Sequence, residues 1–128
     1  MIETQIYESV TQIRMSREVN GKPVYWVAGY LVDGMLVDTG CQHTSSELAA
    51  FLEKKKLCLA ANTHYHEDHI GGNHNIINRF GVDIFAHPDS IPPINQKPAL
   101  YPYQEFAWGY PVPTVVKPVP PVIRTDHY

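Results

Sequence analysis

Four side chains that commonly bind metal ions stand close together in the middle of the sequence. Three histidines and one aspartate lie within six residues, as His64, His66, Asp68 and His69. His64 and His66 alternate, so on an extended chain end both side chains point to the same side and can share one metal ion. Asp68 and His69 lie on the turn that enters the next element, where they can hold a second ion nearby. Imidazole and carboxylate ligands favour zinc and also suit iron or manganese.

The alternative interpretation of this run is a polar loop that happens to be rich in histidine. The chain has 7 histidines in 128 residues. At ordinary residue frequencies, four fixed positions of this kind match by accident less than about once in a thousand sequences. The apolar run before the motif and Gly71-Gly72 after it add structural context. The sequence therefore favours a metal site over a chance cluster.

The elements around the motif indicate an α/β sheet. Residues 57–61 form a wholly apolar run, which is typical of a strand buried on both faces. A helix is expected through Ile76, Ile77 and Phe80, ended by Gly81, and the next strand is expected over residues 82–86. Ligands of such sheets gather beyond the carboxyl ends of the strands, which is where the motif lies.

The residues before the motif predict a hairpin and a helix. One or two strands are expected over residues 2–16, and another over residues 24–32. Asp33-Gly34 then separates this strand from residues 35–37, a strong signal for a hairpin turn. A capping box with Thr44 as cap and Glu47 reaching back to it predicts a helix over residues 44–56.

The tail of the chain differs in character from residues 1–87. Ten of the eleven prolines fall between Pro88 and Pro121, interleaved with five aromatic residues. Because proline cannot donate to a sheet ladder, residues 88–121 are expected to be mainly extended loop. Two interpretations of this aromatic-rich stretch stand: a cover that packs on core surface, or a wall of the substrate site.

Composition places the chain among globular proteins. Hydrophobic residues make up 44% and charged residues 18%, and the net charge of −3 with one short cationic run gives no support for a nucleic-acid partner. No apolar stretch reaches the roughly 20 residues of a membrane span, and the N-terminus lacks the pattern of a signal peptide, so a cytoplasmic location is expected. Cys41 and Cys58 do not form a disulfide framework, and Cys58, inside an apolar run, is expected to pack in the core.

The motif resembles the signature of the metallo-β-lactamase superfamily. The resemblance rests on His64-x-His66-x-Asp68-His69 with Gly71-Gly72, and it extends to Asn62-Thr63 and to Val37-Asp38-Thr39-Gly40. It covers roughly residues 2–90. It implies an αββα sandwich with a dinuclear metal site on one edge, in a family whose members hydrolyse β-lactams, thioesters, lactones, phosphodiesters and sulfate esters.

The resemblance also implies roles for individual residues. His64 and His66 would bind the first metal, and Asp68 and His69 the second, with Asp68 also acting in catalysis by orienting the attacking water. Asp38 would orient a ligand imidazole, although a turn residue before Gly40 is an equal alternative. Glu67 occupies a variable position of the motif and receives no role. His43 and His74 are expected at solvent or on a helix surface.

The pattern of the family is incomplete in this sequence. A third histidine for the first metal, a bridging aspartate and a last histidine for the second have no counterpart, so residues 1–128 are expected to form the N-terminal half of the domain. The leading function is a metal-dependent hydrolase of an ester-like bond on a small-molecule substrate. A non-catalytic metal-binding or interaction fragment is the alternative, and a diiron redox protein is disfavoured by His66.

A half domain is expected to associate, either with further copies of itself or with the missing C-terminal half. The apolar strand residues that would lose their cover are expected to be Tyr25, Val27, Leu31, Leu36, Leu59 and Ile84.

Overall fold

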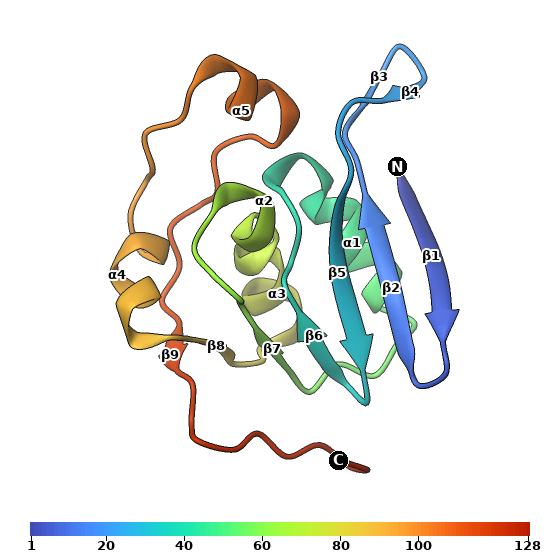
Figure 1. Ribbon diagram of the computed structural model, residues 1–128, viewed down its shortest axis with the longest axis vertical. Helices are drawn as coiled ribbons and strands as arrows, with labels where there is room; N and C mark the ends of the chain where they lie inside the picture. Colours follow the sequence, from blue (N-terminus) through green and yellow to red (C-terminus); the bar gives the residue numbers. More distant parts are fainter.

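A single mixed sheet organises the chain in the computed structural model, which describes residues 1–128 (Figure 1). Its seven strands follow the order β1-β2-β5-β6-β7-β8-β9, and a separate pair, β3 (Glu18–Val19) with β4 (Lys22–Pro23), forms a small hairpin. The strands of the sheet are β1 (Ile2–Tyr7), β2 (Val10–Met15), β5 (Val27–Val32), β6 (Met35–Val37), β7 (Leu59–Ala61), β8 (Ile84–Ala86) and β9 (Lys117–Pro118).

The sheet changes from antiparallel to parallel at β6. The strands β1, β2, β5 and β6 pair antiparallel in succession, whereas β6, β7, β8 and β9 pair parallel. The predicted turn between β5 and β6 is confirmed, because Asp33 and Gly34 both have positive φ, at 48° and 82°. The parallel half places the carboxyl ends of β6, β7 and β8 along one edge.

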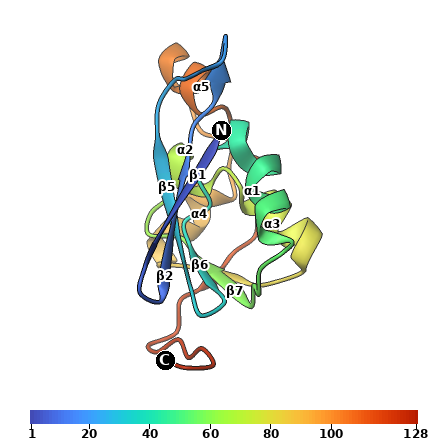
Figure 2. The same ribbon diagram turned by 90° about the vertical axis from the view of Figure 1, so that its right-hand side faces the viewer.

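Helices cover one face of this sheet. Figure 2 shows α1 and α3 together on one side of the strands, with no helix packed flat against the other side. This arrangement supplies one helix layer and one sheet, which is half of an αββα sandwich. The helical elements are η1 (Gln42–Thr44), α1 (Ser45–Leu52), α2 (Glu67–Ile70), α3 (Asn73–Phe80), η2 (Pro88–Ser90), α4 (Ile91–Ile94) and α5 (Pro102–Ala107). None of them combines the length and apolar character needed to cross a membrane.

The helix predicted over residues 44–56 is shorter in the structure, where α1 spans Ser45–Leu52. The predicted capping box is wrong. Thr44 occupies the predicted N-cap position of α1, but its hydroxyl donates to the Cys41 carbonyl at 3.3 Å and makes no capping hydrogen bond. The Glu47 carboxylate pairs at 2.9 Å with the N-terminal ammonium of Met1. The Glu47 carboxylate thus pairs with a group distant in the sequence, and not with the backbone N–H that the capping box predicts.

The core lies between the sheet and the helices. Ile13, Leu36, Leu48, Leu52 and Ile76 are completely buried there. Four of the six residues expected to lose their cover are buried against the helices instead: Val27, Leu31, Leu36 and Ile84. That expectation is wrong for these four because side chains alternate along a strand and theirs belong to the helix-covered face.

The opposite face of the sheet is apolar but only partly covered; we call it the open face. Strand register assigns one set of half-buried or exposed side chains to it: Tyr30, Val32, Met35, Val37, Leu59 and Phe85.

In β7 only Ala60 is fully buried, so the prediction of burial on both faces does not hold within this chain. The prediction for Cys58 is also wrong, since it precedes β7 and is exposed.

The proline-rich tail contains two short helices that the sequence did not predict. Pro92 and Pro102 stand in the first turns of α4 and α5, where the missing N–H of proline has no helical partner to lose. The tail then returns to the sheet, where β9 pairs with β8. Its residues therefore add a strand at one end of the sheet and place α5 above the edge where β6, β7 and β8 end (Figure 1).

Candidate metal centre

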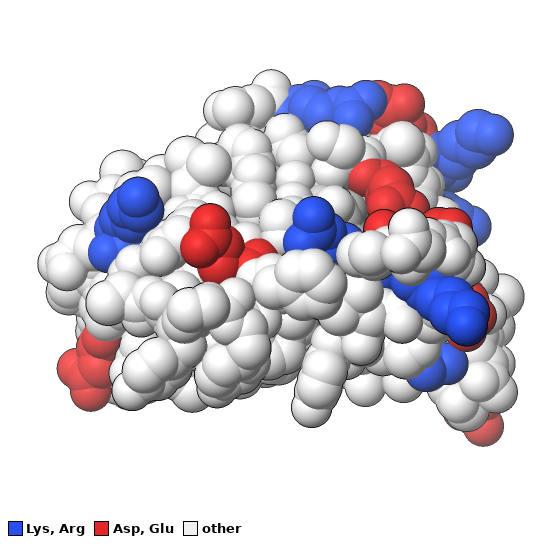
Figure 3. Space-filling view, turned by 90° about the horizontal axis from the view of Figure 1, so that it is seen from above, with Lys and Arg blue, Asp and Glu red and all other residues white.

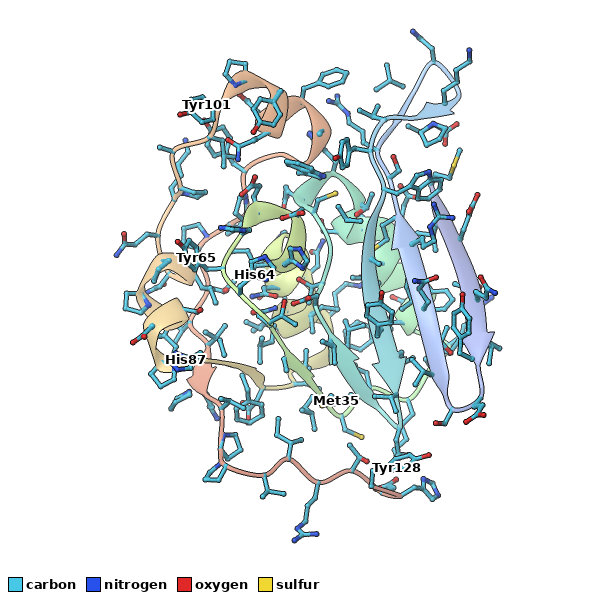
Figure 4. The ribbon with its side chains drawn as sticks, viewed as in Figure 1. Met35, His64, Tyr65, His87, Tyr101 and Tyr128 are labelled. Atoms are coloured by element: carbon cyan, nitrogen blue, oxygen red, sulfur yellow. The ribbon has the colours of Figure 1, made fainter.

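The metal motif lies where β7 ends and α2 begins. The backbone of His66, at φ −69° and ψ 151°, is extended and forms the N-cap position of α2, so the motif crosses from extended chain into a helical turn. Figure 4 shows His64 at this edge, beside the end of β6. The placement beyond the carboxyl ends of parallel strands agrees with the sequence analysis.

Gly71 and Gly72 allow this turn to approach the chain after β6. A Cβ atom on Gly71 would lie 2.2 Å from the Cys41 carbonyl carbon, and one on Gly72 would lie 2.4 Å from the Thr39 carbonyl oxygen. Side chains at these positions would push α2 and α3 away from the site. The glycine pair is therefore a packing requirement of the metal-binding edge.

Three of the four predicted ligands converge in the structure. The ligand atoms of His64, Asp68 and His69 all lie within 4.8 Å of one another. The ring centroids of His64 and His69 are 4.0 Å apart, and Asp68 Oδ2 lies 3.5 Å from His69 Nε2. Two imidazoles and one carboxylate make a donor set that fits zinc, and their spacing lets one ion reach all three.

His66 lies next to this group without joining it. Its ring stands edge-on to the His64 ring, with centroids 4.7 Å apart. The assignment of His64 with His66 to a first ion, and of Asp68 with His69 to a second, stays a prediction.

Asp38 orients one of the candidate ligands. It follows β6 with a φ of 64°, and it is only 4% exposed. Its carboxylate accepts hydrogen bonds from the Thr63 backbone N–H at 2.8 Å, the Thr63 hydroxyl at 2.7 Å and His69 Nδ1 at 2.9 Å. Asp38 is thus both a turn residue with left-handed backbone and a partner of a ligand imidazole, so the two interpretations of the sequence hold together.

The hydrogen bonds also fix which ring nitrogens face the site. Because a carboxylate only accepts, His69 donates from Nδ1 and leaves the Nε2 lone pair free. The Thr63 hydroxyl gives its proton to Asp38, so it accepts from His64 Nδ1 at 2.9 Å, and His64 likewise keeps Nε2 free. Thr63 therefore connects both ligand histidines to one carboxylate, a role that sequence reasoning did not assign.

The electrostatic surroundings of the two histidines differ. The hydrogen bond to Asp38 is the main cause that raises the pKa of His69, with the Asp68 charge adding to it. Desolvation lowers the pKa of His64, and the neighbouring imidazoles of His69 and His66 lower it further. His64 is thereby held in the neutral form that a metal ligand requires.

A buried polar network fastens the site to the fold. The side-chain amides of Asn62 and Asn73 exchange hydrogen bonds at 2.8 and 3.1 Å, and the Thr39 hydroxyl donates to Asn73 Oδ1 at 2.8 Å. The Gly72 N–H in turn donates to the Thr39 hydroxyl. The network joins the ends of β6 and β7 to the start of α3.

Glu67 connects the metal motif to the proline-rich tail. It is 8% exposed, and its Oε1 accepts from Gln104 Nε2 of α5 at 2.7 Å. Gln104 Oε1 accepts in turn from the Tyr101 N–H at 2.7 Å, which begins α5. No sequence pattern predicts this contact, because it joins a variable motif position to a residue 37 positions later.

The segment held by Glu67 presents several aromatic rings to solvent. Tyr101, Tyr103 and Phe106 are each more than half exposed, and Tyr103 and Tyr25 both contact the Trp108 ring edge-on. Figure 3 looks onto this end of the molecule and shows scattered charged groups between broad uncharged areas.

The remaining histidines lie outside the group of converging ligand atoms. His43 is exposed, as expected, and bonds to the Glu105 carbonyl at 2.8 Å, while His87 Nδ1 accepts from the Asp89 N–H and caps η2. His74 lies half-buried on α3, in agreement with the expected position on a helix surface.

Comparison with known proteins agrees with the motif and the fold. A family model described as the metallo-beta-lactamase superfamily matches residues 27–128. The chain therefore belongs to the metallo-β-lactamase superfamily.

Solved structures show the same fold. The metallo-β-lactamase SMB-1, in complex with mercaptoacetic acid, superposes with a TM-score of 0.69 at 18% identity, covering 96% of this chain and 49% of that one. MEM-A1, a subclass B3 metallo-β-lactamase from a soil metagenome library, gives a TM-score of 0.66 at 17% identity, covering 95% of this chain and 48% of that one. FIM-1 from Pseudomonas aeruginosa, in its mono-zinc form, gives a TM-score of 0.60 at 21% identity, covering 71% of this chain and 44% of that one. The chain thus spans about half the length of the structures it matches.

Proposed function

We propose that this chain carries the metal-binding half of a hydrolase site, and that the complete site cleaves an ester-like bond. The observation that carries the proposal is the convergence of His64, Asp68 and His69 within 4.8 Å. The shared Asp38–Thr63 support turns both imidazoles toward the same point, which is a preorganisation that a surface cluster of histidines lacks.

Zinc is the ion that the donor set favours, and the zinc in FIM-1 supports this choice. His64, Asp68 and His69 would hold it, with His66 as a further ligand; a second ion, and iron or manganese in place of zinc, are compatible with the same donors. When bound, such an ion supplies Lewis-acid chemistry, which lowers the pKa of water toward 7 and polarises the scissile carbonyl or phosphoryl oxygen.

The residues of the chain itself would position the reacting water. The Asp68 side chain is 26% exposed, so one carboxylate oxygen is open to accept a hydrogen bond from water while the other faces His69. Asp38 keeps His69 in one tautomer and one orientation throughout. Thioesters, lactones, β-lactams and phosphodiesters are the substrate bonds we propose, because each is cleaved by attack of water at a polarised centre.

We propose further that the aromatic segment around α5 forms a wall of the substrate site. A segment that served only as core cover would bury its rings, whereas Tyr101 and Tyr103 are 70% and 65% exposed. The Glu67–Gln104 hydrogen bond holds this segment beside the metal motif. The wall would contact apolar or planar parts of a small-molecule substrate.

The second candidate is a non-catalytic metal-binding or interaction fragment, which the open face favours. Half-buried apolar side chains such as Val37, Leu59 and Phe85 need a partner surface, either a second copy or a polypeptide that brings the missing ligands. Sedimentation of the purified chain should then show a species larger than 14.5 kDa. Phe85→Glu should return it to a monomer, whereas the control Val115→Glu should not; a stable wild-type monomer at micromolar concentration contradicts the association.

Zinc binding and hydrolysis measured on one preparation test the proposed function. Zinc content would be determined after dialysis, and turnover would be followed on a thioester, a lactone, a β-lactam and a phosphodiester. The chain alone should bind zinc and hydrolyse poorly, because the ligands that would complete the site in this family are not in this sequence.

Addition of a polypeptide carrying the C-terminal half of a superfamily domain should raise the rate of hydrolysis. The variant His64→Ala should abolish this hydrolysis. Zinc retention without hydrolysis in any combination would support the non-catalytic candidate. Absence of zinc retention would reject the hydrolase and the metal-binding fragment, and would leave the interaction fragment, which the sedimentation experiment tests.

A further inference from the structure

Gly29 stands in the middle of β5, a position where glycine is unfavourable. It lies between Ala28 and Tyr30, is buried, and is not among the glycines with positive φ. Glycine inside a strand loses more chain entropy on folding than other residues and has no side chain to pack. Its backbone conformation thus gives no reason for a glycine. Glycine in a strand often marks a site where another backbone segment approaches closely.

The backbone of Asp38 occupies the space that a side chain on Gly29 would need. A Cβ atom on Gly29 would lie 2.7 Å from the Asp38 carbonyl oxygen and 3.3 Å from the Val37 carbonyl oxygen. The shorter distance is well inside van der Waals contact. Asp38 has left-handed backbone, with φ at 64°, and this turn brings its carbonyl against β5 while its carboxylate reaches Thr63 and His69.

Both partners of this contact are held in place. Gly29 pairs with Ile13 of the neighbouring strand β2. The Asp38 N–H donates to the Ala61 carbonyl at 2.8 Å, and the Asp38 carboxylate accepts the hydrogen bonds described for the metal centre. A methyl group at position 29 would therefore displace the Asp38 backbone, and with it the carboxylate that supports both candidate ligand histidines.

We propose that Gly29 is a positioning residue of the metal site, which acts through the backbone of Asp38. The proposal rests on the proposed function, because it assigns Gly29 to the same metal site. The missing side chain of Gly29 lets Asp38 hold His69 directly, and His64 through Thr63, so that both imidazoles keep Nε2 free. Loss of an outer partner of a ligand costs about 10–100-fold in metal affinity, so displacement of this partner should cost about tenfold.

The variant Gly29→Ala adds one methyl group at the point of contact. In the zinc-free chain, the NMR signal of the His69 Nδ1–H should shift and exchange faster with water, because the hydrogen bond to Asp38 lengthens or breaks. Zinc affinity, measured by isothermal titration calorimetry, should fall about tenfold.

Gly81→Ala is the matched control. Gly81 ends α3 with a φ of 63°, and no atom lies within 4 Å of its Cβ position. Alanine is strained at this φ, so the control should lower the urea midpoint of unfolding. It should leave the His69 signal and the zinc affinity unchanged, because it does not touch Asp38.

A double-mutant cycle tests whether Gly29 acts through Asp38. Gly29→Ala should add little to the loss of zinc affinity in Asp38→Asn, because the carboxylate that it displaces is already gone. If Gly29→Ala fails to fold, Asp38→Gly in the same chain should restore folding, because glycine can turn its carbonyl away from the added methyl group.

Three results overturn the proposal: a folded Gly29→Ala variant with an unchanged His69 signal and zinc affinity, additive losses in the cycle, or a double variant Gly29→Ala/Asp38→Gly that also fails to fold. A wild-type chain that retains no zinc rejects the proposed metal site itself. The His69 signal of the zinc-free Gly29→Ala variant then still decides whether Gly29 positions Asp38, so the two failures are distinguishable.

Discussion

Two aspartate–histidine pairs stand at opposite ends of β6, and they differ in what surrounds them. At the carboxyl end of the strand, His69 Nδ1 lies 2.9 Å from Asp38. In the turn before the strand, His127 Nδ1 lies 2.7 Å from Asp33. The two contacts have nearly the same length and the same chemistry. Their distances alone do not say which of them organises a functional site.

Burial of the histidine and the location of the other partners separate the two pairs. The His69 side chain is 26% exposed and shares Asp38 with Thr63 of the same motif, whereas the His127 side chain is 78% exposed and the other partner of Asp33, Thr125, belongs to the same last residues of the sequence. The first pair holds a candidate ligand within a connected network. The second ties the final segment to the turn before β6, assisted by the hydrogen bond from the Tyr128 hydroxyl to Ser9. An ion pair gains its structural role from the groups that it holds in common with its neighbours.

The largest expected effect is on metal binding. His64→Ala should reduce zinc affinity by more than about 100-fold, because loss of an outer partner of a ligand already costs about 10–100-fold. His127→Ala and His43→Ala should retain zinc after dialysis. His66→Ala tests whether the fourth motif residue is also a ligand, and it should lose zinc as well. Equal retention in the His64 and His127 variants would refute the assignment.

A smaller effect is expected from the supporting carboxylate. Asp38→Asn removes the acceptor charge that holds His69 and Thr63, so zinc affinity should fall about 10–100-fold. Asp33→Asn, the matched change at the other pair, should leave zinc affinity unaltered. Isothermal titration calorimetry with zinc measures the affinity of both variants. A comparable loss of zinc affinity in the two variants would mean that the difference in burial between the pairs has no effect on zinc binding.

The buried pair should also give the metal-free chain a pH-dependent stability. The Asp38 hydrogen bond raises the pKa of His69, so its stabilising contribution is complete below the unfolded value near 6.5. The contribution is lost as pH rises through the folded value, which lies above 6.5. Urea midpoints measured in a chelator from pH 6 to 9 should decline, and Asp38→Asn should flatten this slope. A midpoint that rises with pH contradicts the pairing.

The smallest effect belongs to the exposed pair. Hydrogen bonds from Thr125 and His127 lower the pKa of Asp33 to about 2 from 3.8. A lowered carboxylate pKa contributes stability above the unfolded value, which is lost as pH falls from 3.8 toward 2. NMR relaxation should therefore show that residues 125–128 become mobile between pH 3.8 and about 2, before the sheet unfolds. Release of these residues already at neutral pH would show that the contact does not hold them.

Much of the fold could be predicted from the sequence because local signals carried it. The Asp33-Gly34 turn, the strands around it and the helix ended by Gly81 all appeared where expected. The failures have two physical causes. Glu47 pairs with a distant partner, the N-terminal ammonium, instead of capping α1, and Val27 and Leu36 face the helices because the sequence does not say which face of the strand the helices cover.

The sequence by itself determined the superfamily and the types and spacing of the candidate ligands, since these depend on which residues follow one another from His64 to Gly72. Tertiary structure decided which of them converge and what supports them. Asp38 reaches His69 across 31 positions, and Glu67 reaches Gln104 across 37, through contacts that exist only after β6, β7 and the tail have packed. Periodicity and turn chemistry describe neighbours along the chain, whereas a metal centre is made by neighbours in space.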